Sequence, residues 1–339
     1  MESILILTDI HLRSDYVVGF LDAQIATLLK LVNEKRPNAV VINGDIFHKR
    51  SPKAAELLAF KTLLDNLKTK RIIVNRGNHD TVSKSDTTDT VLDLFQNERV
   101  KVVKGAEVVN ICGVDFLFSP HYESEELILR DLKQYPNIPV FGHWGYAGCV
   151  AVRGRAYESL ITKHHIKDRY CFMGHLHTPV ESGLNYVLGT QYSISFGEAN
   201  ADKYLHEILI HDKQIKQVNK KVINFGIRHI SGTFEEVENL IKKFSPNQFF
   251  LLVRVEVNKF QVAVESKLYD TFTSKYSVNH LEFAVKSEAS LSEDNNLLSV
   301  KDMTGKQIDD LVKEYVNLKP ESYTKELLLE YYEKEIRDL

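Results

Sequence analysis

Apolar strand-like runs alternate with amphipathic helical patterns along the first third of this 339-residue chain. Residues 3–8, 39–43 and 71–75 are short, apolar and rich in β-branched side chains, which is typical of buried strands. Between them, the apolar spacing of residues 21–32 and 54–67 predicts helices. Because strands that alternate with helices pair in parallel, this order favours an α/β fold with a mostly parallel sheet.

Strand signals continue through the middle of the chain, and a smaller pattern follows them. Further strands are expected at residues 100–103, 114–118, 139–141, 170–173, 185–188 and 205–210. We therefore predict a first domain over residues 1–222. A strand at 225–232, a helix at 234–244 and an alternating strand at 249–257 then indicate a small α/β domain over residues 223–285.

The C-terminal part of the chain differs in composition. Residues 286–296, KSEASLSEDNN, are small, polar and turn-rich, so we predict a linker over residues 286–299. Two amphipathic helical patterns follow within residues 300–339. Two short helices beyond a linker have little core of their own, which favours docking on a partner; the alternative is that they fold back on the protein's own core. The docking candidates are Ile308, Leu311, Tyr315, Leu328, Tyr331 and Tyr332.

Charge and cysteine content narrow the function classes. The chain has 43 Lys and Arg against 46 Asp and Glu, so no global basic field indicates nucleic acid, and a polyanion would have to be bound locally. Cys112, Cys149 and Cys171 are widely separated, which argues against a disulfide framework and favours a reducing cytoplasm. No apolar run approaches the roughly 18 residues of a membrane span, and the N-terminal run is too short for a signal peptide, so we expect neither.

Five short polar clusters follow predicted strands, at the sheet edge where an open α/β fold places its binding crevice. They are Asp9-x-His11, Gly44-Asp45-x-x-His48, Gly77-Asn78-His79-Asp80, Gly142-His143 and Gly174-His175-x-His177. Carboxylate and imidazole ligands without thiols suit manganese, iron or zinc, and the set exceeds what one four-coordinate ion needs. In an extended turn, residues two apart point to the same side, so Asp9 and His11 would grip one ion. We therefore predict a site for two metal ions.

These clusters, in this order from residue 9 to residue 177, resemble the motif series of the calcineurin-like metallophosphoesterases. The resemblance implies a layered β-sandwich flanked by helices, with two divalent metal ions at its edge. It implies that the first ion is held by Asp9, His11 and His177, the second by Asn78, His143 and His175, and both by a bridging Asp45. It leaves His79 free of metal, so that its imidazole would protonate the leaving oxygen while Asp80 orients it.

The second cluster extends to GDIFHKRSP, residues 44–52, and resembles the SbcD-like nucleases of double-strand-break repair. In that family a histidine follows the bridging aspartate by three residues. His48 matches this position and is a further catalytic candidate. The segment GHLHTPVESGLNYVLGTQYSISFGE, residues 174–198, continues the resemblance, although Gln191 stands where the family has proline. The match covers residues 1–257, and the layout of the chain is similar to that of the short, phage-type subunits of this family.

The resemblance to SbcD-like nucleases implies a function and partners. It implies a manganese-dependent DNA nuclease, with magnesium as the alternative metal, that is an exonuclease on duplex ends and an endonuclease on single strands. It implies a homodimer within a heterotetramer with an SbcC-like ATPase, in bacterial or phage-infected cytoplasm, and a capping, DNA-binding role for residues 223–285. The alternative is a nucleotide or small-phosphodiester hydrolase, which would share all five clusters. A catalytically dead scaffold is disfavoured because no ligand position is substituted.

Several cations near the clusters are candidates for contacts with DNA phosphates. They are Lys49, Arg50 and Lys53 after the second cluster, and Arg153 and Arg155 after the fourth. A solvated helix start explains the first three equally well. The near-neutral total charge favours weak DNA binding by the isolated subunit, which agrees with a nuclease that relies on a partner to grip DNA.

Other notable side chains have ordinary structural explanations. We expect Trp144 to pack beside the fourth cluster, with stacking on a base as the alternative, and Cys149 to be a small buried residue. We expect the histidines outside the clusters to lie on the surface rather than to bind metal. These are His121, His164, His165, His206, His211, His229 and His280.

Overall fold

A computed structural model describes most of the first 285 residues. The described ranges are 1–16, 19–84, 88–150, 155–195, 198–199, 201–223, 225–241, 250–257 and 280–285. The chain divides into two compact units, Met1–Lys286 and Ser287–Leu339, and every described residue belongs to the first. The predicted linker at 286–299 and the predicted docking helices at 300–339, with all six of their docking candidates, lie outside the described residues.

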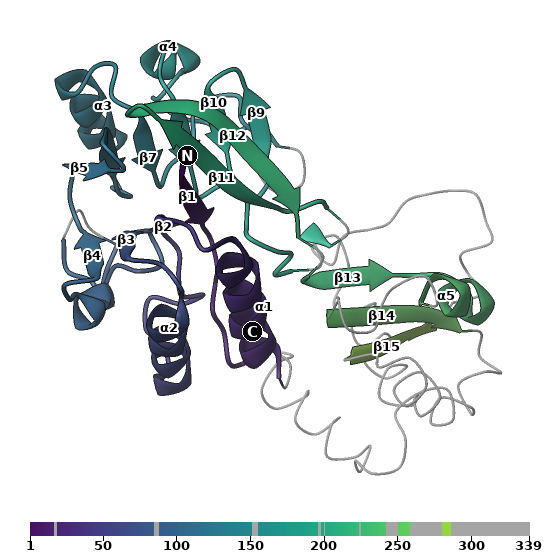
Figure 1. The fold of residues 1–339 in the computed structure, drawn as a ribbon. Coiled ribbons are helices and arrows are strands. Elements are labelled where there is room, and N and C mark those ends of the chain that lie inside the picture. Colours follow the sequence, from purple (N-terminus) through teal and green to yellow (C-terminus); the bar gives the residue numbers. More distant parts are fainter. Residues whose placement is uncertain are drawn as a thin grey trace, which may run out of the picture. The chain divides into compact units, whose positions relative to one another are not determined.

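Six strands form the first sheet, in the order β12-β11-β1-β2-β3-β4 (Figure 1). Their bounds are β1 Glu2–Leu7, β2 Ala39–Asn43, β3 Arg71–Asn75, β4 Val100–Val103, β11 Tyr204–His211 and β12 Gln214–Val222. Strands β1 to β4 pair in parallel, with Ile4 opposite Ala39. Strand β11 returns antiparallel to β1, and β12 pairs antiparallel with β11. The carboxyl ends of β1, β2 and β3 therefore share one edge.

Six further strands form the second sheet, in the order β5-β6-β7-β8-β10-β9. Their bounds are β5 Glu107–Ile111, β6 Val114–Ser119, β7 Val140–Gly142, β8 Cys171–Met173, β9 Val180–Ser182 and β10 Asn185–Val187. Strands β6, β7, β8 and β10 pair in parallel, while β5 and β9 flank them antiparallel. This sheet, like the first, thus has a parallel centre.

Helices cover the outer faces of both sheets. They are α1 Phe20–Lys35, α2 Ala54–Asn66, α3 Glu125–Gln134 and the one-turn α4 Lys163–Ile166, with a 3-10 helix, η1, at Val91–Phe95. In β1, alternate residues face opposite ways, as a pleated strand requires: Leu5 and Leu7 join the core beneath α1 and α2. Ile4 and Ile6 instead join the core between the sheets. A third core on the far face of the second sheet includes side chains of α3 and α4. The layers therefore run helix, sheet, sheet, helix, which confirms the predicted β-sandwich flanked by helices.

A separate three-stranded sheet follows the sandwich in the chain. It consists of β13 Ile227–Ile230, β14 Phe250–Val257 and β15 His280–Val285, all parallel, with α5 Phe234–Ile241 between the first two strands. The sequence predicted the first strand, the helix and the second strand of this α/β unit, but not β15. The predicted boundary near residue 222 stays a prediction.

The division of the parallel strands between two sheets differs from the sequence expectation of one mostly parallel sheet. Parallel pairing within each group was predicted correctly, and a strand was predicted at β11, but the pattern lacked the flanking strands β5, β9 and β12. Strand β12, QIKQVNKKV, is largely polar and exposed, so it carries little of the apolar signal that marks the central strands. Strand pairing between distant segments leaves no local trace in a sequence, so the number of sheets could not be derived from it.

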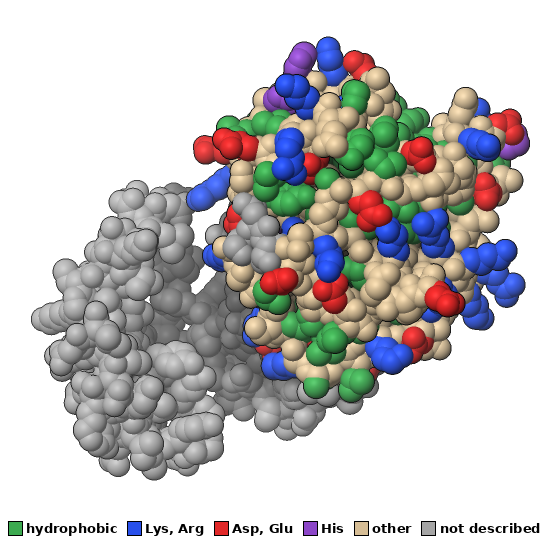
Figure 2. Space-filling view, turned by 90° about the vertical axis from the view of Figure 1, so that its left-hand side faces the viewer, with side chains coloured by type: hydrophobic (Ala, Val, Ile, Leu, Met, Phe, Trp, Pro, Cys, Tyr) green, Lys and Arg blue, Asp and Glu red, His purple; other side chains and the backbone are tan. Residues whose placement is uncertain are grey.

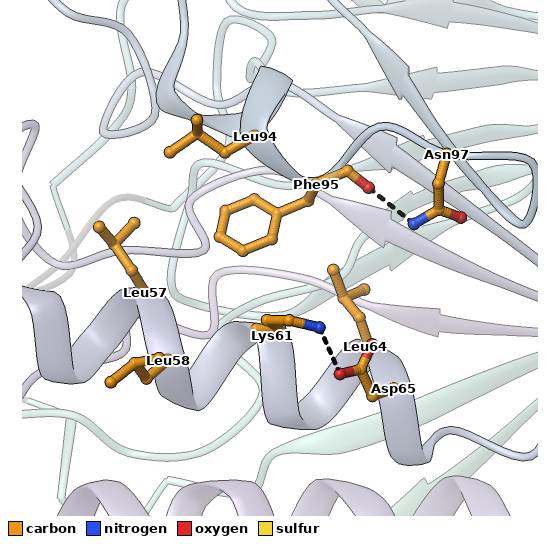
Figure 3. A pocket seen from close by; sticks show the side chains of 8 residues that line it. All are labelled: Leu57, Leu58, Lys61, Leu64, Asp65, Leu94, Phe95 and Asn97. Atoms are coloured by element: carbon orange, nitrogen blue, oxygen red, sulfur yellow. Dashed lines mark hydrogen bonds and ion pairs between the residues drawn. The ribbon is translucent and has the colours of Figure 1, made fainter.

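A small apolar pocket of about 240 Å³ lies between α2 and η1 (Figure 3). Its lining consists of Leu57, Leu58, Lys61, Leu64, Asp65, Leu94, Phe95 and Asn97. Leu58 is 65% exposed and Leu94 is 73% exposed, so the rim of the pocket is apolar and open to solvent. Around such patches, positive and negative side chains are interspersed over the face seen in Figure 2. None of the helices in the described ranges has the length and apolar character needed to cross a bilayer.

Candidate metal centre

The five clusters converge where parallel strands of both sheets end. Asp9 and His11 follow β1, Asp45 follows β2, and Asn78 follows β3 in the first sheet; His143 follows β7, and His175 and His177 follow β8 in the second. Backbone hydrogen bonds tie neighbouring loops together: Asp9 N donates to Gly44 O, and Gly174 N donates to Gly142 O, at 3.0 and 2.9 Å. The site therefore spans the edges of both sheets.

The backbone turns sharply at several of these positions. Asp9, His11, Asp45 and His175 have φ values of 45°, 48°, 50° and 76°, in the left-handed region that non-glycine residues rarely adopt. Asp9 and His11 thus converge through left-handed turns rather than through the extended turn that we expected. Such backbone strain persists when the surroundings enforce it, and it concentrates at functional sites.

Glycines allow the loops to approach one another closely. Gly44 has φ +87°, and a Cβ atom there would collide with the imidazole ring of His143. A Cβ at Gly77 would collide with the backbone nitrogen and the carboxylate of Asp45. Only glycine fits both positions, because they bring a ligand side chain against bare backbone.

The ligand atoms form three overlapping groups within the described residues. The groups are Asp9 with His11 and His177, Asp45 with His143 and His175, and His11 with Asp45 and His79; in each, the ligand atoms lie within 4.8 Å of one another. Nε2 of His11 lies 3.2 Å from Nε2 of His177. Nε2 of His143 lies 3.3 Å from Oδ1 of Asp45. Asn78 joins the second group, since its Oδ1 lies 2.9 Å from Nδ1 of His175.

Outer hydrogen bonds fix which nitrogen of each imidazole faces the centre. Nδ1 of His143 donates to the backbone carbonyl of Asn43 at 2.7 Å, and Nδ1 of His177 donates to the carboxylate of Glu198 at 2.8 Å. Because these acceptors can only take a proton, Nε2 is the nitrogen of each ring that faces the centre, and in the neutral ring it carries the lone pair. Imidazoles held in this way are the usual form of a metal ligand.

The donor set fits divalent cations. The side chains of Asp9 and Asp45 are at most 2% exposed, and two carboxylates buried this closely are costly unless cations compensate them. Nε2 of His143 is buried and makes no hydrogen bond within the described part of the chain, as expected of a nitrogen that awaits a metal. Two carboxylates, four imidazoles and one amide are oxygen and nitrogen ligands without thiols, which suits hard and borderline cations.

The pKa values of the centre reflect burial and close charges. Burial raises the pKa of Asp9 to about 6. Burial also opposes ionisation of Asp45, yet the neighbouring His143 holds the pKa of that carboxyl well below its ordinary value. Burial opposes protonation of His143 too, but Asp45 and Asp9 raise its pKa to about 9. Burial lowers the pKa of His175 to about 3 and that of His11 well below its ordinary value, so both rings present lone pairs.

His79 lies at the centre with one nitrogen held from outside. Its Nδ1 donates to the backbone carbonyl of His48 at 2.7 Å, and its Nε2 lies 3.9 Å from Oδ2 of Asp45. The ring of His48 lies 6.2 Å from that of His79 and 5.6 Å from that of His11. Both predicted catalytic histidines therefore adjoin the ligand groups.

The expected role of Asp80 is wrong in one respect. Its carboxylate accepts backbone N–H bonds from Ile46 at 3.0 Å and from Gly77 at 2.9 Å, and the group that orients His79 is the His48 carbonyl. Asp80 thus joins the loops after β2 and β3 rather than the imidazole. Sequence adjacency suggested the contact with His79, but the turn directs the two side chains to different partners. Burial raises the pKa of Asp80 to about 7.

A buried ion pair behind His177 was missed by the sequence analysis. Glu198 is 7% exposed; it accepts from Nδ1 of His177, from Oγ1 of Thr190 at 2.7 Å and from Nζ of Lys203 at 2.9 Å. Nζ of Lys203 also donates to the carbonyl of His177 at 2.8 Å. Burial opposes ionisation of Glu198, but the hydrogen bond from His177 and the charge of Lys203 lower the pKa of this carboxyl to about 2. The only signal was that Glu198 ends the segment that carried the family resemblance.

The histidines outside the clusters do not all lie on the surface. His164, His165 and His211 are exposed, as expected. His206 is buried between the sheets, because its alternation in β11 places it on the face of Ile208 and Ile210. The side chain of His121 is only 17% exposed and lies beside the metal ligands. The side chains of His229 and His280 lie outside the described ones.

The predicted DNA-contacting cations already have partners. Nζ of Lys49 lies 2.5 Å from the carboxylate of Asp15, and Nζ of Lys53 lies 3.9 Å from it. Arg50 pairs with Glu123 at 3.4 Å and donates to the hydroxyl of Thr81 and, at 2.7 Å, to the carbonyl of Ser83. Arg155 is exposed, and Arg153 lies outside the described residues. These contacts agree with the solvated helix start, and the role in phosphate binding stays a prediction.

Trp144 and Cys149 have the structural roles that we expected. Both are 2% exposed and belong to the core on the outer face of the second sheet. Nε1 of Trp144 donates to Oγ of Ser119 at 3.2 Å. A ring buried in this way packs in the core and offers no face for a base to stack on.

The chain matches a family model and is similar to several solved structures. A family model described as calcineurin-like phosphoesterase matches residues 2–179. Among solved structures, an archaeal phosphodiesterase is similar at 15% identity and TM-score 0.35, covering 65% of this chain and 99% of its own. The nuclease MPE of Pseudomonas putida has 16% identity and TM-score 0.33, with coverages of 60% and 83%. The purple acid phosphatase PPD1 of yellow lupin has 10% identity and TM-score 0.40, with coverages of 65% and 53%. No curated protein matches the chain.

Proposed function

Because this chain belongs to the calcineurin-like phosphoesterase family, we propose that it is a manganese-dependent DNA nuclease of the SbcD-like type. It acts as an exonuclease on duplex DNA ends and as an endonuclease on single strands. The family accounts for phosphoester hydrolysis. The choice of DNA as substrate rests on the resemblance of residues 44–52 and 174–198 to SbcD-like nucleases and on the geometry of the loop that carries His48.

The loop that carries His48 supports the nuclease most directly. This loop supplies the carbonyl that orients His79, at 2.7 Å, so the residues that follow the bridging candidate Asp45 are part of the catalytic apparatus. The cations Lys49, Arg50 and Lys53 come immediately after His48. A substrate with phosphates on either side of the scissile bond would have one near the centre and another near this loop.

The residues of the chain have separate tasks in hydrolysis. Asp9, His11 and His177 would hold one cation, Asn78, His143 and His175 would hold the other, and Asp45 would contribute to both sites. When bound, two such cations supply Lewis-acid charge to the phosphate and acidify a water molecule. Water adds to phosphorus and releases a proton to solvent, the bond from phosphorus to the leaving oxygen breaks, and protonated His79 gives its Nε2 proton to that oxygen. The His48 carbonyl keeps the other nitrogen of His79 occupied, so the proton leaves from the side that faces the centre.

Hydrolysis of end-labelled duplex DNA tests the proposal. The assay compares manganese with magnesium, runs a chromogenic phosphodiester in parallel, and uses His79→Ala as the inactive control. Stepwise shortening of the DNA that needs manganese and disappears in the variant is the expected result.

Hydrolysis of small substrates is the second candidate function. The ion pairs of Lys49 and Lys53 with Asp15 favour it, because a cation already neutralised by a carboxylate attracts phosphate less. Cleavage of the chromogenic ester with persistent failure on DNA, even with an ATPase partner and ATP added, would establish a nucleotide or small-phosphodiester hydrolase instead.

An SbcD-like nuclease acts with an SbcC-like ATPase, and we propose that this partner docks on residues 300–339. Deletion of residues 297–339 is then expected to abolish partner binding and to leave metal-dependent hydrolysis of the chromogenic ester intact. Loss of both would count against a separable docking segment. A cytoplasmic site of action accompanies this proposal, and the unpaired state of Cys112, Cys149 and Cys171 is compatible with it.

The resemblance to SbcD-like nucleases also implies a homodimer. We propose the rim of the α2–η1 pocket as the surface through which the two copies bind. Leu58 and Leu94 are exposed there, and Lys61 and Asp65 lie one turn apart on α2 (Figure 3). In a two-fold interface, a cation and an anion on one helix can each face the opposite charge of the second copy. Light scattering should find a dimer for the native chain and a monomer for the double variant Leu58→Asp, Leu94→Asp. A dimer in both would exclude this surface.

A further inference from the structure

His121 is an imidazole at the metal centre that belongs to none of the five clusters. It follows β6 by two residues, so it lies at the same edge of the second sheet as the ligands after β7 and β8. Its ring centroid lies 5.4 Å from that of His175 and 6.5 Å from that of His143. It therefore adjoins one of the two predicted metal sites, the one formed by Asp45, Asn78, His143 and His175.

The backbone of His121 is fixed by a buried arginine. Its N–H donates to the carbonyl of Arg76 at 3.2 Å, and its own carbonyl accepts from the guanidinium of Arg76 at 2.6 Å. Arg76 is fully buried and directly precedes the third cluster, so it connects the loop after β3 with the loop after β6. A residue held at both its N–H and its carbonyl keeps its side chain in a constant place relative to the ligand loops.

The side chain of His121, in contrast, has no hydrogen bond to any described residue. Its Nδ1 is buried without a partner, and its Nε2 lies 3.9 Å from the nearest carboxylate oxygen, that of Glu123. A buried nitrogen left without a partner is unfavourable, so its presence calls for a partner that the described residues do not supply. The ring also falls outside all three ligand groups.

We propose that His121 contacts the substrate, donating a ring N–H hydrogen bond to a non-bridging oxygen of the phosphodiester held at the centre. This inference rests on the proposed function, because it assumes that a phosphate occupies the space beside His143 and His175. It places one imidazole, His121, on the second-sheet side of the substrate. His48 and His79, which follow strands of the first sheet, lie on the other side.

Two other roles for His121 make different predictions. As an additional metal ligand, it would be required for full metal content. As a space-filling ring, it would be replaceable by any side chain of similar size without effect on phosphate binding. A hydrogen-bond donor to phosphate is needed for neither metal content nor folding.

The test uses the full-length, manganese-loaded protein and the variants His121→Ala, His121→Asn and His121→Gln. Asparagine places an amide N–H near the position of Nδ1, and glutamine places one near that of Nε2. His211→Gln is the matched control, since the His211 side chain is 61% exposed at the far end of β11. Three quantities are measured: manganese content per chain, the Kd of inorganic phosphate by calorimetry, and kcat and KM for a chromogenic phosphodiester.

The expected result is full manganese content in every variant and a phosphate Kd raised about tenfold to hundredfold in His121→Ala, the effect of one hydrogen bond to a charged group. KM should rise in parallel, and at least one of the two amide variants should recover much of the affinity. Loss of manganese, an unchanged phosphate Kd, or an equal loss in all three variants would overturn the proposal. If the native protein cleaves no phosphodiester, the proposed function fails, while the phosphate titration still decides the role of His121.

Discussion

Two histidines of the centre, His143 and His177, face it in the same way but are supported differently. Nδ1 of His143 donates to the neutral backbone carbonyl of Asn43, at 2.7 Å. Nδ1 of His177 donates to the buried carboxylate of Glu198 at 2.8 Å, and Lys203 offsets the negative charge of this carboxylate. A carboxylate behind a ligand imidazole makes it a stronger donor than a carbonyl does. The two halves of the centre thus combine similar ligands with unequal support.

We therefore infer that ligand type alone does not set the affinity of each half for its metal ion. The half with Asp9, His11 and His177 has its support in side chains, which a substitution can remove. The half with His143 has its support in the backbone, which no substitution removes. Single substitutions can act on both halves, on neither, or on one.

Removal of the shared ligand should abolish the difference between the halves by emptying both. Asp45 belongs to two ligand groups and is the predicted bridge. In Asp45→Ala we expect manganese content near zero and activity reduced by more than the roughly 100-fold that loss of an outer partner costs. Metal analysis and the chromogenic assay measure the two effects, with Asp93→Ala, a half-exposed acid paired with Lys104, as control. Two manganese ions retained per chain would rule out the bridge.

Removal of His79 should affect neither half. Its Nδ1 is bound to the His48 carbonyl, and the predicted ligand set is complete without it. In His79→Ala we expect two manganese ions per chain and kcat lowered by about 10²-fold or more, because the leaving oxygen loses its proton donor. The same metal analysis and assay apply. A fall in manganese content would instead identify His79 as a ligand, in agreement with its place in the group with His11 and Asp45.

The candidate ligands of both halves could be predicted from the sequence, but the residues that surround them could not. The seven ligand candidates could be named from the sequence, because each lies within a few residues of a strand end and belongs to a short motif. His121 obeys the same positional rule, following β6, but a single histidine without a motif gave no reason to prefer it over a surface residue.

Glu198 could not be found from local pattern at all. It lies 21 residues after His177, beyond a hairpin, and only the folded loop brings its carboxylate to that imidazole. The role of Asp80 failed for the opposite reason. It is adjacent to His79 in sequence, yet its carboxylate turns to the backbone of Ile46 and Gly77. The spacing of a motif and its place after a strand are local properties, whereas hydrogen-bond partners are decided by the packing of distant segments.

Substitution of Glu198 should weaken one half only. In Glu198→Gln, the acceptor of the His177 proton becomes a neutral amide oxygen of similar shape. We expect the affinity for one of the two manganese ions to fall about tenfold to hundredfold, with the other unchanged. Calorimetric titration of the metal-free protein resolves the two events. Glu181→Gln, which removes an exposed acid paired with Lys220, is the control. Equal weakening of both ions would show that the halves do not differ in the way that we infer.

His206 is a buried histidine whose ring makes no hydrogen bond to another described residue. It lies between the sheets, with Lys220 as its partner across the strand ladder, and burial lowers its pKa to about 4. The contrast is with His143, whose acid neighbours raise its pKa to about 9. If neighbouring carboxylates cause the difference between the pKa values of His143 and His206, His206 should remain neutral in the folded protein at pH values where its imidazole is protonated in the unfolded chain.

The sign of the pH effect follows from that difference. Below the ordinary pKa of histidine the unfolded state binds a proton that folded His206 does not, so acid favours unfolding. Between pH 7 and pH 5.5, the native chain should lose about 1 kcal/mol more of its free energy of unfolding than His206→Gln does. Urea unfolding of the metal-free protein measures this, and the comparison cancels the other histidines, which both chains share. His211→Gln should follow the native chain. An equal pH dependence in His206→Gln and the native chain would mean that burial alone does not keep a histidine of this fold neutral.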